Sequence, residues 1–316
     1  MIYLYILIFL LSCLLLSRSV ASLIKLLSVL RNVLHLSEFT VAFVLMAIAT
    51  SLPELIVGIS AAMSQAPALA LGSIFGTNIV NLTLIVGVVA FVSRGIKADS
   101  RFVRQNLGAS LLVGLIPFLM LFDGRLSRLD SGVLLLIFVI YLVLLFRNRR
   151  KSKEKFEKIG TKKIFRAFLL FVFALILLLI ASRLIVYSAT RIGEALNFPL
   201  VVIGLIVLAL GTSLPELVFG LKSALAKHPD MNLGNILGST VVNVTLILGT
   251  IGLIHPLVLE NKLSIWFTAL FSLFIFALFF AFSFSRKRIS RTEGIILTVL
   301  YFVFVAVQLI GFKGFL

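Results

Sequence analysis

The feature that most constrains this chain is a hexapeptide that occurs twice inside apolar sequence. Residues 50–55 read Thr-Ser-Leu-Pro-Glu-Leu, and residues 212–217 read the same. Around the hexapeptide, residues 47–87 align without a gap on residues 209–249, and 20 of 41 positions are identical. The shared positions include proline, glutamate, asparagine and glycine, which chance matches between apolar segments do not explain. The chain therefore contains two copies of one structural unit.

The composition indicates that this unit lies in a membrane. The chain is 61% hydrophobic and 13% charged, with a mean hydropathy of +1.19. Apolar runs long enough to span a bilayer recur along the whole chain, which predicts an all-α polytopic membrane protein. Its single Cys13 excludes an intramolecular disulfide and a cysteine metal cluster. We expect ten transmembrane helices, over residues 2–28, 38–65, 69–93, 102–122, 129–147, 164–190, 198–226, 231–255, 263–285 and 291–312.

The basic residues predict how these helices are oriented. The net charge is +17, and most Lys and Arg residues lie in short segments between the expected helices. With the N-terminus outside, about 20 of them fall on the inner side and 5 on the outer side. Both termini are therefore expected to be extracellular. This clustering in loops also argues against a nucleic-acid partner and favours contact with anionic membrane lipid.

The expected helices divide into three parts of the chain. Residues 1–147 form the first five-helix repeat, residues 148–163 a basic cytoplasmic linker, and residues 164–316 the second five-helix repeat. Five is an odd number, so the second copy must enter the membrane inverted relative to the first. Inverted repeats with a binding site near the bilayer midplane are typical of secondary transporters.

Two carboxylates mark the centre of this arrangement. Of 12 acidic residues, only Glu54 and Glu216 lie deep inside apolar stretches. A carboxylate at bilayer depth is unfavourable, so each is a functional-site hypothesis. Pro53 and Pro215 lack an N–H and are expected to break the second and seventh helices.

The broken helices offer further groups, and an alternative. We expect freed carbonyls, such as those of Ala47 and Ala209, to face a cavity where a cation binds. The spacing Ser-x-x-Glu, from Ser51 and from Ser213, also fits a capping box, in which the glutamate only closes a helix end. Capping and ion binding are compatible.

A second repeated segment, residues 72–81 and 234–243, adds hydroxyl and amide groups. Thr77 and Asn81 are four residues apart and share one helix face, as do Ser239 and Asn243. The glycines of this segment predict close helix packing, and hydrogen bonding between helices is the alternative role of the asparagines. Carboxylates, hydroxyls, amides and carbonyls form an all-oxygen set that suits hard cations such as Ca²⁺ and Na⁺.

Two carboxylates neutralise one Ca²⁺ or two Na⁺, so competition between these ions provides a physical basis for exchange. An intramembrane aspartyl-type hydrolase would also pair two acids, but the chain has no deep aspartate. We therefore expect a transporter and not an enzyme. A passive channel remains an alternative, because these residues do not distinguish saturable exchange from conduction.

Residues 49–54, 76–81, 211–216 and 238–243 resemble the two alpha-repeats of the cation/calcium exchanger superfamily, especially the prokaryotic sodium/calcium exchangers. The resemblance implies Na⁺/Ca²⁺ antiport by alternating access across a prokaryotic inner membrane. It implies that the first and sixth helices slide across a core, with no cofactor and no obligate protein partner. Ala49 stands where the family usually has Gly, and Thr77 where it usually has Ser.

Carried over position by position, the resemblance implies that the glutamates bind both ions and the adjacent threonines lie near Ca²⁺. The Na⁺ sites would be lined by Ser51, Ser213, Ser239, Thr77 and the carbonyls of Ala47 and Ala209. Asn243 stands where potassium-dependent members have Asp, which argues against coupling to K⁺. Proton-coupled relatives usually have a Glu near the end of the glycine–asparagine segment, and its absence here argues against coupling to H⁺. Coupling to H⁺ or K⁺ remains the alternative. The implied ligands are Glu54, Glu216, Thr50, Thr212, Ser51, Ser213, Asn81, Asn243, Thr77, Ser239, Ala47 and Ala209.

Overall fold

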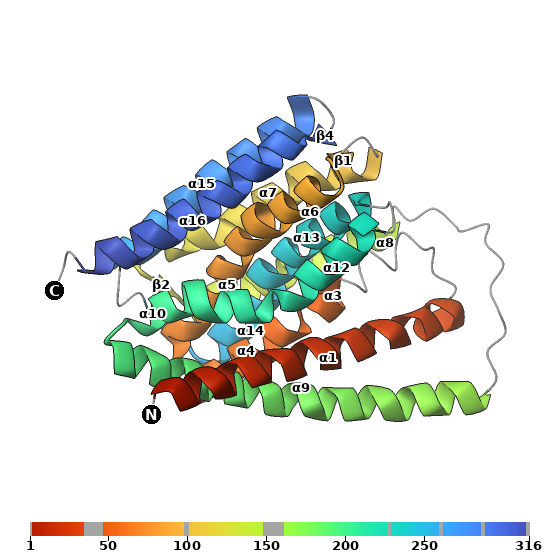
Figure 1. Cartoon of the computed structure of the whole chain (residues 1–316), viewed down its shortest axis with the longest axis horizontal. Coiled ribbons are helices and arrows are strands. Elements are labelled where there is room, and N and C mark those ends of the chain that lie inside the picture. Colours follow the sequence, from red (N-terminus) through yellow and green to blue (C-terminus); the bar gives the residue numbers. More distant parts are fainter. Residues whose placement is uncertain are drawn as a thin grey trace.

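The computed structural model describes residues 2–34, 47–97, 101–147, 161–225, 229–258, 262–285 and 288–313. Helices dominate this part of the chain (Figure 1). The first half contains α1 (Ile2–Leu34), α3 (Ala47–Thr50), α4 (Leu52–Met63), α5 (Pro67–Val80), η2 (Asn81–Ile85), α6 (Val86–Val92), α7 (Arg101–Met120), η3 (Leu121–Asp123) and α8 (Arg128–Arg147). The second contains α9 (Thr161–Leu196), α10 (Leu200–Ile203), η4 (Gly204–Leu208), α11 (Ala209–Thr212), α12 (Leu214–Leu225), α13 (Asp230–Val242), η5 (Asn243–Ile247), α14 (Leu248–Ile254), α15 (Lys262–Ser285) and α16 (Arg291–Lys313).

Four short strands modify the all-α expectation. β1 (Ile96–Lys97) pairs antiparallel with β4 (Arg288–Ile289), and β2 (Arg125–Leu126) pairs antiparallel with β3 (Leu257–Val258). Each ladder joins a segment of the first half to one of the second, so the loops of the two halves are tied together. The predicted linker, residues 148–163, lies outside the described residues except for its last three, which belong to α9.

Six helical segments in the described residues are long and apolar enough to cross a membrane. A seventh is counted if the bent pair of residues 200–212 and 214–225 is one span. In the apolar windows of Pro67–Val92 and Met231–Ile254, 83% of the residues are buried, against 28–44% in the windows of the other four segments. These two therefore form the centre of the molecule, and the other four expose apolar side chains on its surface.

The internal repeat is visible in the boundaries of the helices. α3, α4, η2 and α6 each recur 162 residues later as α11, α12, η5 and α14, with identical lengths. α5 and α13 correspond in the same way, within one residue at the start. The duplicated sequence has therefore folded into duplicated local structure.

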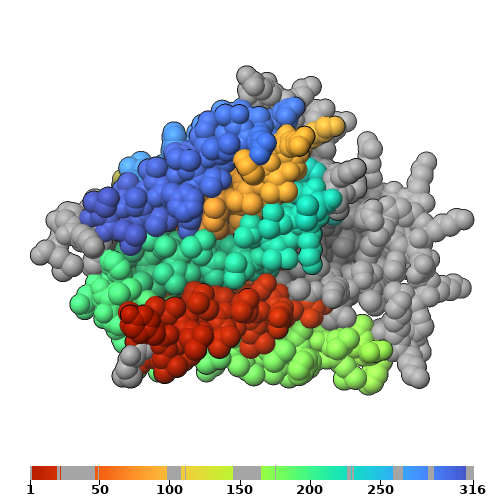
Figure 2. Space-filling model, viewed as in Figure 1, coloured from red at the N-terminus to blue at the C-terminus, as the bar shows by residue number. Residues whose placement is uncertain are grey.

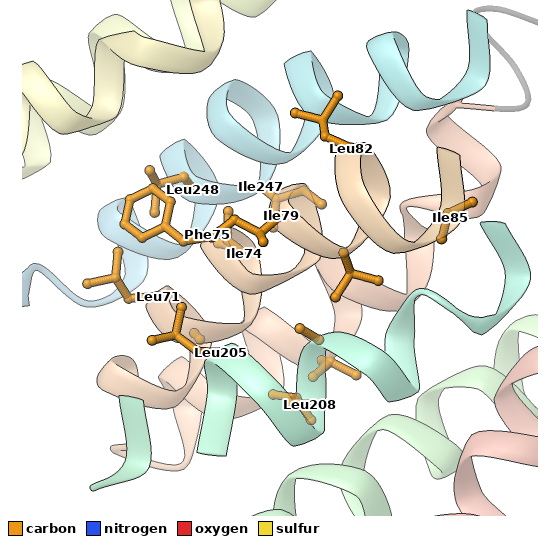
Figure 3. Close-up of a cluster of buried hydrophobic side chains, with 14 of the residues drawn as sticks. Leu71, Ile74, Phe75, Ile79, Leu82, Ile85, Leu205, Leu208, Ile247 and Leu248 are labelled. Carbon is orange, nitrogen blue, oxygen red and sulfur yellow. The ribbon is translucent and has the colours of Figure 1, made fainter. Parts of the chain in front are cut away.

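Glycines allow the central helices to approach closely. A Cβ on Gly72 would overlap the carbonyl oxygen of Val201, and a Cβ on Gly204 would lie 2.8 Å from the backbone nitrogen of Ser73. Backbone therefore packs on backbone where α5 crosses α10 and η4, in agreement with the predicted small-residue packing. Large side chains fill the space around this crossing (Figure 3), and those labelled are Leu71, Ile74, Phe75, Ile79, Leu82, Ile85, Leu205, Leu208, Ile247 and Leu248.

The outer helices form two groups on opposite sides of this centre. α1 lies along α9 on one side, and α15 and α16 lie on the other (Figure 1). Figure 2 shows α1, α12, α6 and α16 following one another across one face. Large apolar side chains such as Leu11, Leu14, Phe173 and Phe302 are exposed on these outer helices, as expected for surfaces in contact with lipid.

Candidate ion-binding site

The repeated hexapeptides interrupt two helices at equivalent positions. Ser51 separates α3 from α4, and Ser213 separates α11 from α12. The backbone has the same unusual conformation at both serines, with φ −85° and ψ −1° at Ser51 and φ −80° and ψ 2° at Ser213. The helix axes on either side of Ser213 differ by 42°. Each break lies two residues before the proline, and each proline is the second residue of the helix that follows.

Both glutamates lie in the first turn of the helix after the break. Their exposed fractions are 2% for Glu54 and 0% for Glu216, so neither faces lipid. They are close enough for their charges to interact, and no carboxylate oxygen of either has a hydrogen-bond partner among the described residues. Buried polar atoms are normally paired, so four unpaired carboxylate oxygens in one place indicate a site for a ligand. The positive end of each helix dipole favours negative charge at this position.

The capping-box alternative is not realised at the first break. Ser51 makes no side-chain capping hydrogen bond, and its hydroxyl has no partner among the described residues. The Ser213 hydroxyl is also without a partner there. The hydroxyls and carboxylates therefore do not close the helix ends and stay available to a ligand.

The expectation that the breaks free the carbonyls of Ala47 and Ala209 is wrong. The Ala47 oxygen accepts a hydrogen bond from the Ser51 N–H at 3.0 Å, and the Ala209 oxygen accepts one from the Ser213 N–H at 3.1 Å. The acceptor that loses its donor to a proline is four residues earlier, which here is Ala49 or Gly211. The Ala47 oxygen also accepts a hydrogen bond from the Thr50 hydroxyl, and the Ala209 oxygen accepts one from the Thr212 hydroxyl, both at 3.4 Å. Both lone pairs of each carbonyl therefore face a donor from the protein.

Hydroxyl groups connect the two halves of the molecule through symmetric contacts. The Thr50 and Ser239 hydroxyl oxygens are 3.4 Å apart, and those of Thr77 and Thr212 are 3.3 Å apart. The repeat offset of 162 residues converts the first pair into the second. The Thr50 hydroxyl also donates to the Asn235 Oδ1 at 3.2 Å, a contact that sequence reasoning did not anticipate. Each hexapeptide therefore packs on the second repeated segment of the opposite half.

The two central asparagines have different surroundings. The Asn243 Nδ2 donates to the Asn78 Oδ1 at 3.1 Å, which leaves the Asn243 Oδ1 without a partner. Neither side-chain atom of Asn81 has a partner among the described residues. Asn78 is a residue that sequence reasoning missed, and its spacing of one position after Thr77 gave no periodic signal. It orients the Asn243 amide and leaves its oxygen free.

A further feature that sequence reasoning missed is the π-helical turn that begins at each of these asparagines. η2 starts at Asn81 and η5 at Asn243, while η4 immediately precedes Ala209. Thr83 and Thr245 lie in the middle of η2 and η5, and their hydroxyls bond to the carbonyls of Ile79 and Val241. Such turns are frequent at functional sites because they shift side chains out of the regular helical register.

The structure buries every predicted ligand in the interior, and contacts between the halves bring Thr50 to Ser239 and Thr77 to Thr212. All of the predicted ligands are less than 3% exposed. The unpaired atoms there are oxygens and amides, and the described residues contain no group of three or more His, Cys, Asp and Glu side chains that could hold a metal. The arrangement therefore suits a hard cation held by oxygen ligands from both halves, rather than a transition metal.

Comparison with known proteins agrees with this chemistry. The profile of the family described as Sodium/calcium exchanger protein matches residues 4–147 and 166–310. The inner membrane protein YrbG of Escherichia coli is 32% identical over 243 residues, which cover 72% of this chain and 73% of YrbG. The sodium/calcium exchanger MaX1 of Methanosarcina acetivorans is 29% identical over 325 residues, covering 90% of this chain and 92% of MaX1.

The fold is also similar to solved structures. The sodium–calcium exchanger NCX_Mj soaked with 10 mM Na⁺ and zero Ca²⁺ aligns with a TM-score of 0.72 at 29% sequence identity, covering 97% of this chain and 99% of that one. The same exchanger soaked with 10 mM Na⁺ and 10 mM Sr²⁺ gives a TM-score of 0.72 at 30% identity, with the same coverage. The profile match covers most of the sequence, and the chain therefore belongs to the sodium/calcium exchanger protein family, whose members are membrane antiporters.

Proposed function

We propose that this protein exchanges Ca²⁺ for Na⁺ across the membrane by alternating access to one site between its two halves. The observation that carries the proposal is the pair of buried carboxylates, Glu54 and Glu216, whose oxygens lack partners among the described residues. Two such charges are neutralised by one Ca²⁺ or by two Na⁺. Since the two ions need the same carboxylates, one must leave before the other binds.

We propose the twelve predicted residues as the ligand set. Glu54 and Glu216 would bind both ions, with Thr50 and Thr212 near Ca²⁺. Asn81 would lie at the centre, and Asn243 would contribute its free oxygen. The Na⁺ positions would be lined by Ser51, Ser213, Thr77, Ser239 and the carbonyls of Ala47 and Ala209.

We further propose ten membrane spans arranged as two inverted five-helix repeats, divided at the linker of residues 148–163. Broken and shorter segments, such as α4 and α7, would complete the spans that length and hydropathy identify. The start of α1 and the end of α16 lie at the same end of the molecule (Figure 1), as an even number of spans requires. The positive-inside pattern would place both termini outside the plasma membrane of a prokaryote and the linker in the cytoplasm.

The test is ⁴⁵Ca²⁺ uptake into Na⁺-loaded proteoliposomes that contain Glu54→Gln or Glu216→Gln. These substitutions keep the shape of the side chain and remove its charge, so we expect uptake to fall to background and Ca²⁺-dependent thermal stabilisation to disappear. Glu194→Gln is the matched control, because Glu194 is exposed at the end of α9 and should leave uptake unchanged. Full uptake by both site variants would refute the proposal.

The coupling ion is tested in the same vesicles by imposing Na⁺, K⁺ and H⁺ gradients separately. We expect only the Na⁺ gradient to drive Ca²⁺ uptake. Uptake driven by a pH gradient alone would make the protein a proton-coupled exchanger that uses the same site. A requirement for K⁺ would contradict the expectation drawn from Asn243.

A further inference from the structure

Two helix junctions flank the proposed site and are related by the repeat. In the first, a Cβ on Gly58 of α4 would overlap the Ile251 side chain of α14. In the second, a Cβ on Gly220 of α12 would lie 2.8 Å from the Val89 Cγ2 of α6. The repeat offset converts Gly58 into Gly220 and Val89 into Ile251. In each junction a branched apolar side chain from the opposite half therefore rests on a glycine.

The junctions differ in one further residue. Asn232 of α13 contacts Gly220, and its Oδ1 would lie 2.6 Å from a Cβ on that glycine. The equivalent residue in the first half is Ala70, which is fully buried. The second junction therefore combines a smaller apolar residue, Val89 in place of Ile251, with a larger polar residue. The volumes approximately compensate, but the chemistry changes from apolar to polar.

The Asn232 amide has no structural role that accounts for its burial. Its exposed fraction is 0%, and neither its Nδ2 nor its Oδ1 has a hydrogen-bond partner among the described residues. Burial of an amide without partners is unfavourable, because each unpaired group has lost its hydrogen bonds to water. An apolar residue would pack in this place without that penalty, as Ala70 does in the first half.

A row of polar side chains on α13, which we call the polar path, leads from Asn232 to the proposed site. Asn232, Asn235 and Ser239 are spaced three and four residues apart on α13 and so lie on one face of the helix. Asn235 accepts the hydrogen bond from Thr50, and its Nδ2 has no partner among the described residues. The path begins in the first turn of α13, at the end of the helix, and leads inward to the hydroxyls of the site.

We propose that the junction of α6, α12 and α13 is a polar gate for cations, in which the Asn232 amide oxygen, buried while these helices are in contact, becomes a ligand for an entering Na⁺ or Ca²⁺ when they separate. The equivalent junction of α4, α5 and α14 is an apolar seal. The two faces of the membrane therefore differ in the barrier to dehydration of the ion. This proposal rests on the proposed exchange function, and Figure 2 shows that α6 and α12 lie next to each other at the surface.

The test exchanges the chemistry of the two junctions while keeping their volumes. The variant Val89→Ile/Asn232→Ala makes the second junction like the first, and Ala70→Asn/Ile251→Val makes the first like the second. The initial rate of Na⁺-driven ⁴⁵Ca²⁺ uptake at low Ca²⁺ is measured in everted and in right-side-out membrane vesicles. The ratio of these two rates reports access from the two faces, and thermal unfolding shows whether each variant folds.

We expect Val89→Ile/Asn232→Ala to change this ratio roughly tenfold, the effect of one lost polar ligand. The midpoint of Ca²⁺-dependent thermal stabilisation should not change, because the gate acts on access and not on the bound state. The reciprocal variant should move the ratio in the opposite direction. If Na⁺-driven uptake persists and neither variant changes the ratio, or both move it in one direction, the gate is refuted. Absence of Na⁺-driven uptake in the unmodified protein refutes the exchange function instead.

Discussion

A close backbone approach beside the site makes Gly76→Ala an informative substitution. Gly76 lies on α5, one residue before Thr77, and packs against η4 and α11. A Cβ at this position would overlap the Leu205 carbonyl oxygen and would lie 2.8 Å from the Ala209 Cβ. Both neighbours are backbone or a first side-chain carbon, so neither can rotate away. The helices themselves must therefore move apart.

The magnitude follows from these distances. Carbon atoms in contact are about 3.5–4.0 Å apart, so α5 must move roughly 1 Å away from α11. Inserting a methyl group into a closely packed contact of this kind destabilises by about 1–3 kcal/mol. The same shift would break the contact of 3.3 Å between the Thr77 and Thr212 hydroxyls. We therefore expect a loss of stability together with a loss of exchange.

The assay compares apparent melting temperatures in detergent and Na⁺-driven Ca²⁺ uptake for Gly76→Ala and Gly108→Ala. Gly108 is the control because it also lies in a helix, α7, and a Cβ there has no neighbour within 4 Å. Replacing an unconstrained helical glycine by alanine stabilises by about 0.5–1 kcal/mol. The packing argument fails if Gly76→Ala is as stable and as active as Gly108→Ala.

Three further predictions concern the site itself. Thr212→Val should weaken Ca²⁺ binding roughly tenfold in titrations, since it removes the hydroxyl that contacts Thr77. The control Thr250→Val removes a hydroxyl that bonds to the Leu246 carbonyl one turn earlier, and it should leave Ca²⁺ binding unchanged. Asn78→Ala should lower Ca²⁺ affinity without loss of folding, because the Asn243 amide loses the partner that orients it; unchanged affinity would contradict that role. Vesicles loaded with Ca²⁺ are placed in a medium without Na⁺ or Ca²⁺, kept alkaline so that protons do not replace these ions at the carboxylates. They should release Ca²⁺ at least about a hundredfold more slowly than in a medium with Na⁺. The empty site would have to change its access with a buried charge uncompensated, which costs about 3–5 kcal/mol. A rapid release would indicate a channel.

The repeat made much of the fold predictable. Duplicated sequence folds into duplicated helices because both copies carry the same pattern of proline, glycine and apolar residues. The expected segments 69–93 and 231–255 correspond to Pro67–Val92 and Met231–Ile254, which the structure places at the centre. The family assignment, which the hexapeptides and the glycine-rich segments first indicated, is confirmed by the profile match.

Other features depend on contacts that local sequence does not encode. The π-helical turns η2 and η5 have the sequences Asn-Leu-Thr-Leu-Ile and Asn-Val-Thr-Leu-Ile, which an ordinary helix would accept equally well. The role of Asn78 depends on Asn243, which is 165 residues away in the chain. The error over Ala47 and Ala209 had a local cause, because the N–H of each serine still bonds to the alanine carbonyl four residues earlier.

The two copies of the repeat are most alike where they meet and diverge away from that region. Under alternating access both halves hold the same ion, so an equal contribution from each half keeps the site usable from either side. The pairs Thr50 and Thr212, and Glu54 and Glu216, are identical. Under the proposed inverted topology the junction residues would face opposite sides of the membrane, where ion concentrations differ, and no shared ligand requires them to match. Ala70 and Asn232 therefore differ in chemistry, whereas the one pair of ligands that differs, Thr77 and Ser239, keeps its hydroxyl group, as expected of a symmetric site reached by two unequal routes.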